Sequence, residues 1–348
     1  MTTTTKSHET KRITGPRLSS DEIHRFQSDG YLVVRGVFDP DLCRRYVDDH
    51  VKKAMEEYGG LREGDPTTYD TDITRRMATG EGYAPPIGVM IRKGQWDDPL
   101  PDGPDWIFQN TKLLSVLDQI HDDYDDNDDN NNSYSNDGKD KSATNDSKKR
   151  SWEWLHSSNN LGWIHVRLPH IGPNRTNDSP TEPKPRWHVD GGHFTPHLLT
   201  SPEQSVVILP MLRGVEKGGG NTLVIRGSHL EFGRLLHRSD GLSKDETQDC
   251  RDIVDEWQQQ ETPSVLFSEG RLAVDEIAPC DAGDALLLHP HVIHAAGFHT
   301  NQNTTQLRVA FNLGTKWTRQ PEAVADRSIL EATFAMATQD TKQPMKPG

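Results

Sequence analysis

The feature that most constrains the fold is a series of short apolar runs between Leu161 and Trp317, separated by Gly, Pro and Asn. Short β-branched and apolar runs with turn signals between them are typical of strands. A succession of strands without alternating helices favours an antiparallel barrel or sandwich. Within this part of the chain, residues 247–260 have a helical pattern, which predicts an excursion between two strands. We therefore predict a mainly β domain with helices packed outside it. The runs are LGWIHVRL, SVVILPML, NTLVIRG, RLAVDEI, DALLLH and LRVAFNLG.

Upstream of these runs, the sequence carries helix start and stop signals. Ser19, followed by Glu22, is a capping box, and Gly30 ends the helix that it begins. Asp39 and Pro40 begin a second helix, because proline is favoured at the first helical position. The predicted elements are helices at 20–28, 40–58 and 111–121, a strand at 31–38, and an irregular region at 61–108.

An acidic segment interrupts this pattern. Residues 122–150 are rich in Asp and Asn and nearly free of apolar side chains, so burial cannot offset the entropy lost on ordering them. A length of 348 residues suits a single catalytic-sized domain. We expect a disordered leader at 1–18, one domain at 19–320 that contains a disordered insertion at 122–150, and a C-terminal helix and tail at 321–348.

Composition narrows the class of partner and the compartment. The formal net charge of -14 argues against nucleic-acid binding, which needs clustered Lys and Arg. No apolar stretch is long enough to span a membrane, and the first residues, MTTTTKSHETKR, lack the apolar core of a signal peptide. The 3 cysteines are widely spaced and odd in number, which suits a reducing compartment. We expect a cytoplasmic monomer or weak homo-oligomer that binds a small molecule and neither nucleic acid nor membrane.

A peroxisomal address is the lesser alternative. The segment RLSSDEIHR approaches a peroxisomal import signal, but Arg25 occupies its last position and breaks the match.

The first candidate for chemistry is RWHVDGGHF, residues 186–194. His188 and Asp190 lie two apart, so on extended backbone both side chains leave one face and can reach one ion. An imidazole and a carboxylate suit a first-row metal such as iron. The alternative is a hydrogen-bonded pair without a metal. His193 could line the same site or be a structural histidine, and Trp187 is predicted to belong to the core.

A third ligand has to come from a distant strand, and GDALLLHPHVIHAAGFHT supplies four candidates. His289 closes an apolar strand before Pro290 interrupts pairing. His299 follows Gly297 in a segment with turn character, which predicts a surface position. His291 and His294 both remain, since spacing alone cannot separate them.

Two arginines on strand-like runs could bind an anion. Arg308 in LRVAFNLG would be buried on a sheet face, and a buried guanidinium needs an anion because it cannot be discharged. The alternative for Arg308 is a salt bridge to an acidic residue of the protein. Arg167 in HVRLP could line the same active site.

Taken in order, WHVDGG, GGGNTLVIRGSH, CDAGDALLLHPHVIHAAG and LRVAFNLG resemble the phytanoyl-CoA dioxygenase family of Fe(II)- and 2-oxoglutarate-dependent oxygenases. The N-terminal FQSDGYLVVRGVFDP is similar to the opening of that family, so the resemblance covers about Ser19 to Trp317. It implies a double-stranded β-helix, a cupin-like jelly-roll with iron between its two sheets, which agrees with the strand pattern.

Carried over residue by residue, the resemblance makes His188, Asp190 and His294 the iron ligands and catalytic residues. It assigns Arg308 to the distal carboxylate of 2-oxoglutarate, and we also predict Arg167 as a cofactor-binding residue. It makes EKGGGNT a tight turn beside the site, with His229 structural. Two departures from the family pattern are Val189, often Gln, and Ala295–Ala296, where many members have Ser or Gly.

The resemblance implies an oxidoreductase that uses Fe(II), 2-oxoglutarate and O2 to hydroxylate a small organic substrate, with formation of succinate and CO2. Because Asp190 is retained, oxygenation is implied rather than halogenation. The alternatives are an iron-dependent cupin-type enzyme without 2-oxoglutarate, and a catalytically silent jelly-roll binding protein.

Overall fold

The computed structural model of the chain describes residues 16–69, 88–92, 105–122, 150–156, 163–168, 185–190, 198–238, 254, 257–259, 261–297, 299–301, 306–325 and 327–339. Its helices are α1 (Ser20–Asp29), α2 (Pro40–Tyr46), α3 (Lys52–Gly59), α5 (Asp105–Phe108), α6 (Thr111–His121), α7 (Ser228–Arg238), α9 (Glu261–Ser268) and α10 (Ile329–Gln339). Its strands are β1 (Tyr31–Val34), β2 (Gly88–Arg92), β3 (Trp152–Trp154), β4 (Trp163–Arg167), β5 (Val207–Pro210), β6 (Thr222–Arg226), β7 (Ala273–Glu276), β8 (Ala285–Leu288), β9 (His294–Ala296) and β10 (Arg308–Trp317).

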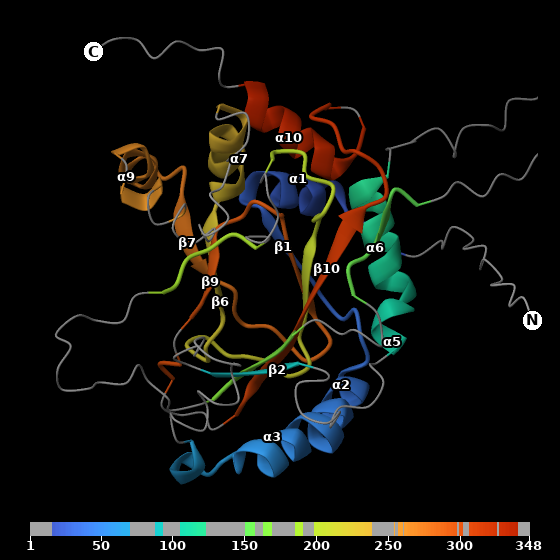
Figure 1. Cartoon of the computed structure of the whole chain (residues 1–348), viewed down its shortest axis with the longest axis vertical. Coiled ribbons are helices and arrows are strands. Elements are labelled where there is room, and N and C mark those ends of the chain that lie inside the picture. Colours follow the sequence, from blue (N-terminus) through green and yellow to red (C-terminus); the bar gives the residue numbers. More distant parts are fainter. Residues whose placement is uncertain are drawn as a thin grey trace, which may run out of the picture.

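The strands form two sheets, as Figure 1 shows. The larger sheet has the order β1-β8-β5-β10-β4-β2, with β3 also paired to β10, and the smaller sheet has the order β7-β6-β9. Every strand pairing in the described part is antiparallel. Two facing antiparallel sheets with crossing connections form the double-stranded β-helix that the sequence predicted.

Alternate residues of the strands divide the interior into two apolar layers. In β8, Leu286 and Leu288 belong to the cluster that also holds Val224 of the smaller sheet, whereas Leu287 belongs to the cluster that holds Phe26 of α1. Successive strand side chains point to opposite faces. One face of the larger sheet therefore packs on the smaller sheet, and the other packs on helices.

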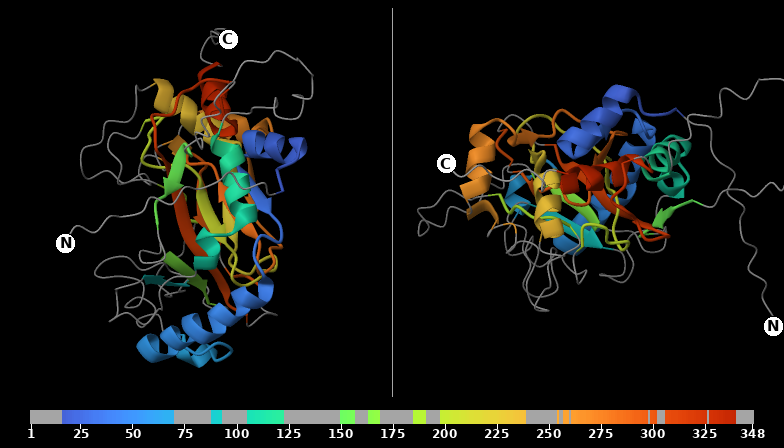
Figure 2. Two further views of the ribbon diagram at one scale, coloured as in Figure 1. Left: turned by 90° about the vertical axis from the view of Figure 1, so that its right-hand side faces the viewer. Right: turned by 90° about the horizontal axis from the view of Figure 1, so that it is seen from above.

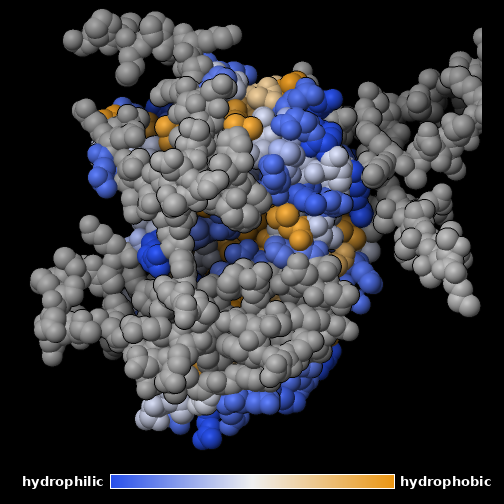
Figure 3. Space-filling view, in the orientation of Figure 1, coloured by the Kyte–Doolittle hydropathy of each residue, from blue (hydrophilic) through white to orange (hydrophobic). Residues whose placement is uncertain are grey.

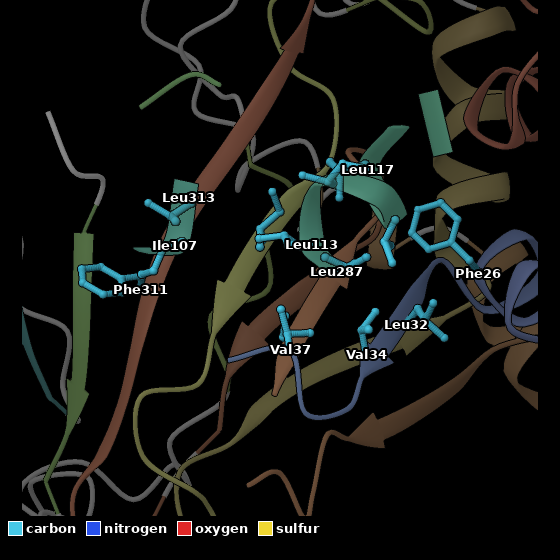
Figure 4. Packing of buried hydrophobic residues seen from close by; sticks show 14 of the residues in the cluster. Phe26, Leu32, Val34, Val37, Ile107, Leu113, Leu117, Leu287, Phe311 and Leu313 are labelled. Carbon is cyan, nitrogen blue, oxygen red and sulfur yellow. The ribbon is translucent and has the colours of Figure 1, made fainter. Parts of the chain in front are cut away.

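The helical layer is the larger source of buried apolar surface. Figure 4 shows side chains from α1, α5 and α6 meeting those of β1, β8 and β10. Figure 2 shows α6 running along the sheet and α2 and α3 following each other at one end. On the outer side, hydrophilic residues cover most of the visible described surface over α2, α3 and α6 (Figure 3). The labelled side chains are Phe26, Leu32, Val34, Val37, Ile107, Leu113, Leu117, Leu287, Phe311 and Leu313.

The predicted helix boundaries follow their local signals. The Ser19 side chain accepts from the Glu22 backbone and Glu22 bonds back to the Ser19 backbone, so the capping box is confirmed. Gly30 ends α1 in the left-handed conformation at φ 81°. The Asp39 carboxylate caps α2, and a π-helical turn at Val47–Val51 joins α2 to α3. The helix predicted at 111–121 is α6.

Each predicted strand-like run contains a strand, but the prediction of an irregular region at 61–108 was wrong in part. That region contributes β2, which pairs with β4, and the short helix α5. Its pairing partner lies far along the chain, so no local signal marked it. The strand predicted at 31–38 ends at Val34, and the sequence missed β3, α7, α9 and β9.

Several predictions fall wholly or mainly outside the described residues. They are the leader, most of the insertion at 122–150, and most of the helix at 247–260, of which residues 254 and 257–259 are described as helical. Within the described residues, no helix is long and apolar enough to cross a membrane.

The two apolar layers generate a stability prediction. Val309 in β10 is fully buried, so Val309→Ala should lower the free energy of unfolding by about 2 kcal/mol through lost methyl burial and a residual cavity. Val274→Ala in β7 is the matched control, because Val274 is 52% exposed, and it should change that energy by less than about 0.5 kcal/mol. Urea denaturation measures both, and equal losses would contradict the assignment of layers.

A buried histidine predicts how the free energy of unfolding changes at low pH. His121 donates from Nδ1 to the Leu117 carbonyl, and its Nε2 bonds the Ser205 hydroxyl. Burial lowers the pKa of His121 to about 4. An unfolded histidine has a pKa of about 6.5, so below that pH the unfolded chain takes up a proton that the folded chain refuses. Stability should fall between pH 6.5 and 4, by on the order of 3 kcal/mol from this residue.

The measurement is urea denaturation at pH 7 and pH 4.5. His121→Asn should lose part of the pH dependence, while His24→Asn, at an exposed position, should retain it. An unchanged slope in His121→Asn would show that this histidine does not set the acid limit.

Candidate metal centre

Two backbone hydrogen bonds bring the separated metal motifs together. The His188 N–H donates to the His294 carbonyl at 2.9 Å, and the His294 N–H donates to the His188 carbonyl at 2.9 Å. The pair is an isolated antiparallel bridge, and β9, which begins at His294, pairs with β6. The smaller sheet therefore fixes where His188 lies.

The three predicted ligand side chains converge. One ligand atom each from His188, Asp190 and His294 lies within 4.8 Å of the others. The Asp190 carboxylate is 3.6 Å from His188 Nε2 and 3.7 Å from His294 Nε2. Ligand atoms about 2.0–2.2 Å from one metal lie roughly 3 Å apart when adjacent, so a small closure of this group would complete a three-ligand face.

Both imidazoles present the same nitrogen to the centre. His188 Nδ1 donates to the Arg186 carbonyl at 3.0 Å, and His294 Nδ1 donates to the Val292 carbonyl at 3.1 Å. Since carbonyls only accept, Nε2 of each ring carries the free lone pair. These backbone contacts set the tautomer that a metal ligand requires.

Burial keeps the His294 ring neutral. Desolvation, followed by the neighbouring His188, lowers the pKa of His294 to about 4, although the Asp190 charge acts in the opposite direction. The His294 side chain is 9% exposed, whereas those of His188 and Asp190 are 32% and 25% exposed. The group is therefore closed on the His294 side, and its other two side chains are partly exposed. Two nitrogens and one carboxylate with open positions fit a non-haem ferrous ion.

Two arginines lie side by side on neighbouring strands next to this group. Arg308 of β10 is the direct antiparallel partner of Arg167 of β4, so both side chains leave the same face. Arg308 donates to the Thr222 hydroxyl at 2.9 Å. The stem of Arg167 packs against Gly220, where an added Cβ would lie 3.2 Å from the Arg167 Cβ.

Neither arginine has an acidic partner among the described residues. Arg308 and Arg167 are 2% and 5% exposed, and Nε of both and Nη1 of Arg167 have no hydrogen-bond partner there. Burial lowers the pKa of Arg308 to about 10, and burial together with Arg308 lowers that of Arg167 to about 9. The alternative of a salt bridge to a protein acid is therefore absent from the described part.

Sequence reasoning missed His165. It lies two residues before Arg167 on β4, opposite Ala310, and so shares the face of both arginines. Burial, followed by Arg167, Arg308, His188 and His294, lowers its pKa well below the ordinary value. His165 is therefore on the arginine face of β4, near enough to both arginines and both ligand histidines for their charges to affect its pKa. Its alternation with Arg167 is the sequence signal that could have found it.

The other histidines of the late motif lie elsewhere. His289 bonds the Thr333 hydroxyl and accepts from the His291 N–H, and His289 and His291 both pack near Phe334. The predicted surface position of His299 was wrong: it is 7% exposed and forms an isolated antiparallel bridge with Gly219. His229 is buried and bonds the Gln27 carbonyl, as a structural histidine would.

Three further predictions concern residues around the ligands. Trp187 is partly buried against the main apolar cluster, and Val189, between the ligands, is 2% exposed. The segment EKGGGNT is a turn that leads into β6, with Gly218 and Gly220 at positive φ. His193 lies outside the described residues.

Fold and ligand group together define a class of protein, the jelly-roll oxygenases that hold a metal through two histidines and one carboxylate. The family model "Phytanoyl-CoA dioxygenase (PhyH)" matches residues 26–307, and the chain belongs to this family. It is accordingly an oxygenase-type enzyme that depends on iron and 2-oxoglutarate, with O2 as the oxidant.

Distant solved structures are similar to the chain. One is the "non-heme alpha ketoglutarate dependent carbocyclase SnoK from nogalamycin biosynthesis" (13% identity, 86% of this chain and 84% of that chain, TM-score 0.44). Another is HygX from Streptomyces hygroscopicus with nickel and 2-oxoglutarate bound (14%, 87% and 88%, TM-score 0.43). A third is EvdO2 from Micromonospora carbonacea var. aurantiaca complexed with 2-oxoglutarate (15%, 89% and 95%, TM-score 0.42). Curated protein sequences contain no match.

Proposed function

We propose that the chain hydroxylates a small organic substrate, with a ferrous ion held by Nε2 of His188, the Asp190 carboxylate and Nε2 of His294. The convergence of these three donors within 4.8 Å carries the proposal. When bound, iron with 2-oxoglutarate and O2 supplies the oxidant for a C–H bond, and succinate and CO2 are formed.

Arg308 holds the distal carboxylate of 2-oxoglutarate in this proposal, and Arg167, its partner on β4, places a second positive charge beside it. A guanidinium suits a carboxylate because its paired N–H groups match the two oxygens and its charge is permanent. The Thr222 hydroxyl accepts from one Arg308 nitrogen and so orients the side chain, while Arg308 Nε has no protein partner in the described part.

The chain also orients the ligand side chains and excludes water from one side of the metal centre. The mutual backbone bonds of His188 and His294 fix both rings before a metal arrives, and Nδ1 of each ring is held by a carbonyl. Val224, opposite His294 on β6, belongs to the apolar layer between the sheets. That layer excludes water from the closed side of the centre and leaves the other side for substrate.

Hydroxylation is favoured over the alternatives by specific residues. Asp190 is retained, whereas halogenation in this family requires the loss of that carboxylate. A cupin-type enzyme without 2-oxoglutarate has no use for Arg308, which lies buried and without an acid in the described part. A silent binding protein would not need all three metal donors.

The proposal also covers the domain organisation, the oligomeric state and the compartment. A single domain at 19–320 would be a cytoplasmic monomer or weak homo-oligomer whose partner is a small molecule, without nucleic acid or membrane. Two features support it: the net charge of -14, and the free, buried Cys43 and Cys280, which suit a reducing compartment.

The ligand assignment predicts a spectroscopic result. Anaerobic protein with Fe(II) and 2-oxoglutarate should show a visible metal-to-ligand charge-transfer band, and absence of that band in folded wild-type protein would refute the proposed function. His188→Ala, Asp190→Ala and His294→Ala should each abolish the band and uncoupled succinate formation. His291→Ala, also at a buried histidine, is the matched control and should retain both if the protein remains folded.

The proposed contact between Arg308 and 2-oxoglutarate predicts a change in the Kd of 2-oxoglutarate. Arg308→Met should raise the Kd of 2-oxoglutarate about 10- to 150-fold, since a hydrogen bond to a charged group contributes about 1.5–3 kcal/mol. Titration of the charge-transfer band measures that Kd. Arg44→Met, at an arginine whose side chain is 52% exposed, should leave it unchanged. A Kd within twofold of wild type in Arg308→Met would remove Arg308 from the co-substrate site.

A further inference from the structure

The two arginines bring more positive charge to the site than the co-substrate can balance. This inference rests on the proposed function. Four positive charges, two from ferrous iron and one each from Arg167 and Arg308, face one negative charge from Asp190 and two from 2-oxoglutarate. One positive charge remains. His188 and His294 add none as ligands, because Nδ1 of each ring donates to a backbone carbonyl and Nε2 would hold the metal.

No described acidic side chain supplies the missing negative charge. Burial and the charge of Arg308 lower the pKa of Arg167. Burial lowers the pKa of Arg308, and Cys280 acts in the opposite direction. The two cations are register partners on adjacent strands, so each disfavours the other. An uncompensated charge at such depth is costly, and a bound anion relieves that cost.

The arginines differ in what they can reach. Arg308 lies on β10 and is tied to Thr222 of the smaller sheet. Arg167 lies on β4, between β10 and β2, which is one strand nearer the edge of the larger sheet. The aliphatic stem of Arg167 packs against Gly220. Nε and Nη1 of Arg167 have no hydrogen-bond partner among the described residues. Arg308 is therefore held by a hydrogen bond to the smaller sheet, whereas Nε and Nη1 of Arg167 remain available to a ligand.

We propose that Arg167, which the sequence analysis assigned to the co-substrate, instead binds the carboxylate of the substrate, which is therefore a small monocarboxylic acid. A monocarboxylate carries the one negative charge that balances the site, whereas a phosphate monoester would overcompensate it. The unpartnered Nε and Nη1 of Arg167 can form the paired bonds that a carboxylate accepts.

His165 lies on the same face of the sheet as the proposed anion site. It shares the face of Arg167 two residues along β4, which corresponds to a rise of about 7 Å. Its electrostatic neighbours include both arginines and both ligand histidines. A substrate whose carboxylate lies on Arg167 would extend along this face past His165, and its carbon chain would reach the metal.

The test uses wild-type protein with Fe(II) and saturating 2-oxoglutarate under anaerobic conditions. Straight-chain monocarboxylates from propionate to decanoate are titrated against the charge-transfer band, with primary alcohols and alkyl phosphates of the same lengths as matched probes. At least one acid should perturb the band with at least tenfold higher affinity than its alcohol and its phosphate. Equal affinities for acid and alcohol, or preference for the phosphate, would overturn the proposal without any variant.

The variants then locate the anion. Arg167→Met should weaken the acid at least tenfold while the Kd of 2-oxoglutarate stays within threefold, and Arg167→Lys should recover part of the acid affinity. Arg308→Met should show the reverse pattern. If Arg167→Met weakens 2-oxoglutarate as strongly as Arg308→Met does, both arginines serve the co-substrate and the inference fails. If wild-type protein forms no band at all, the proposed function itself has failed.

Discussion

Two backbone hydrogen bonds between His188 and His294 are the constraint on which the site depends. Each residue donates to and accepts from the other at 2.9 Å, although they belong to segments far apart in the chain. His294 also begins β9, which pairs with β6. The ligand rings are therefore aimed by the smaller sheet rather than by the metal. The apolar layer between the sheets, with Val224 and Ala310, stabilises this arrangement and closes one side of the centre. A ferrous ion would meet a preformed face with its tautomers already set.

The buried guanidiniums oppose that stability. Arg167 and Arg308 are adjacent, nearly inaccessible and without acidic partners in the described part, and burial lowers the pKa of both. Burying a guanidinium without a counter-charge is unfavourable, so an anion that bound beside these two residues would relieve part of that cost. Binding of a carboxylate co-substrate and a carboxylate substrate to one positively charged pocket would also couple the two: each anion would relieve the repulsion between the arginines. In the proposed function, the same two buried charges that disfavour the fold would favour anionic ligands.

Local chemistry explains which parts of the fold were predictable. The capping box of Ser19 and Glu22, the Asp39–Pro40 start and the apolar run of β8 each depend on neighbours within a few residues, and each is confirmed. By contrast, β2 is a strand because β4 lies beside it, and β9 is one because β6 does. His299 was predicted at the surface from nearby turn residues, yet it is buried against Gly219. His165 drew no notice, because an unremarkable histidine in a strand acquires meaning only from the arginines and ligands around it.

The succession of strands, the helix caps and the His-Val-Asp pair could be read from the sequence, and a family resemblance selected His294 over His291. These features are written in residue types and short spacings. Three results depend on the folded chain: three ligand atoms meet within 4.8 Å, Arg167 lies opposite Arg308, and His165 shares their face of the sheet. The physical reason is that strand register and sheet packing join residues separated by most of the domain. Charges and ligands interact through space, and their spacing along the chain does not set that distance.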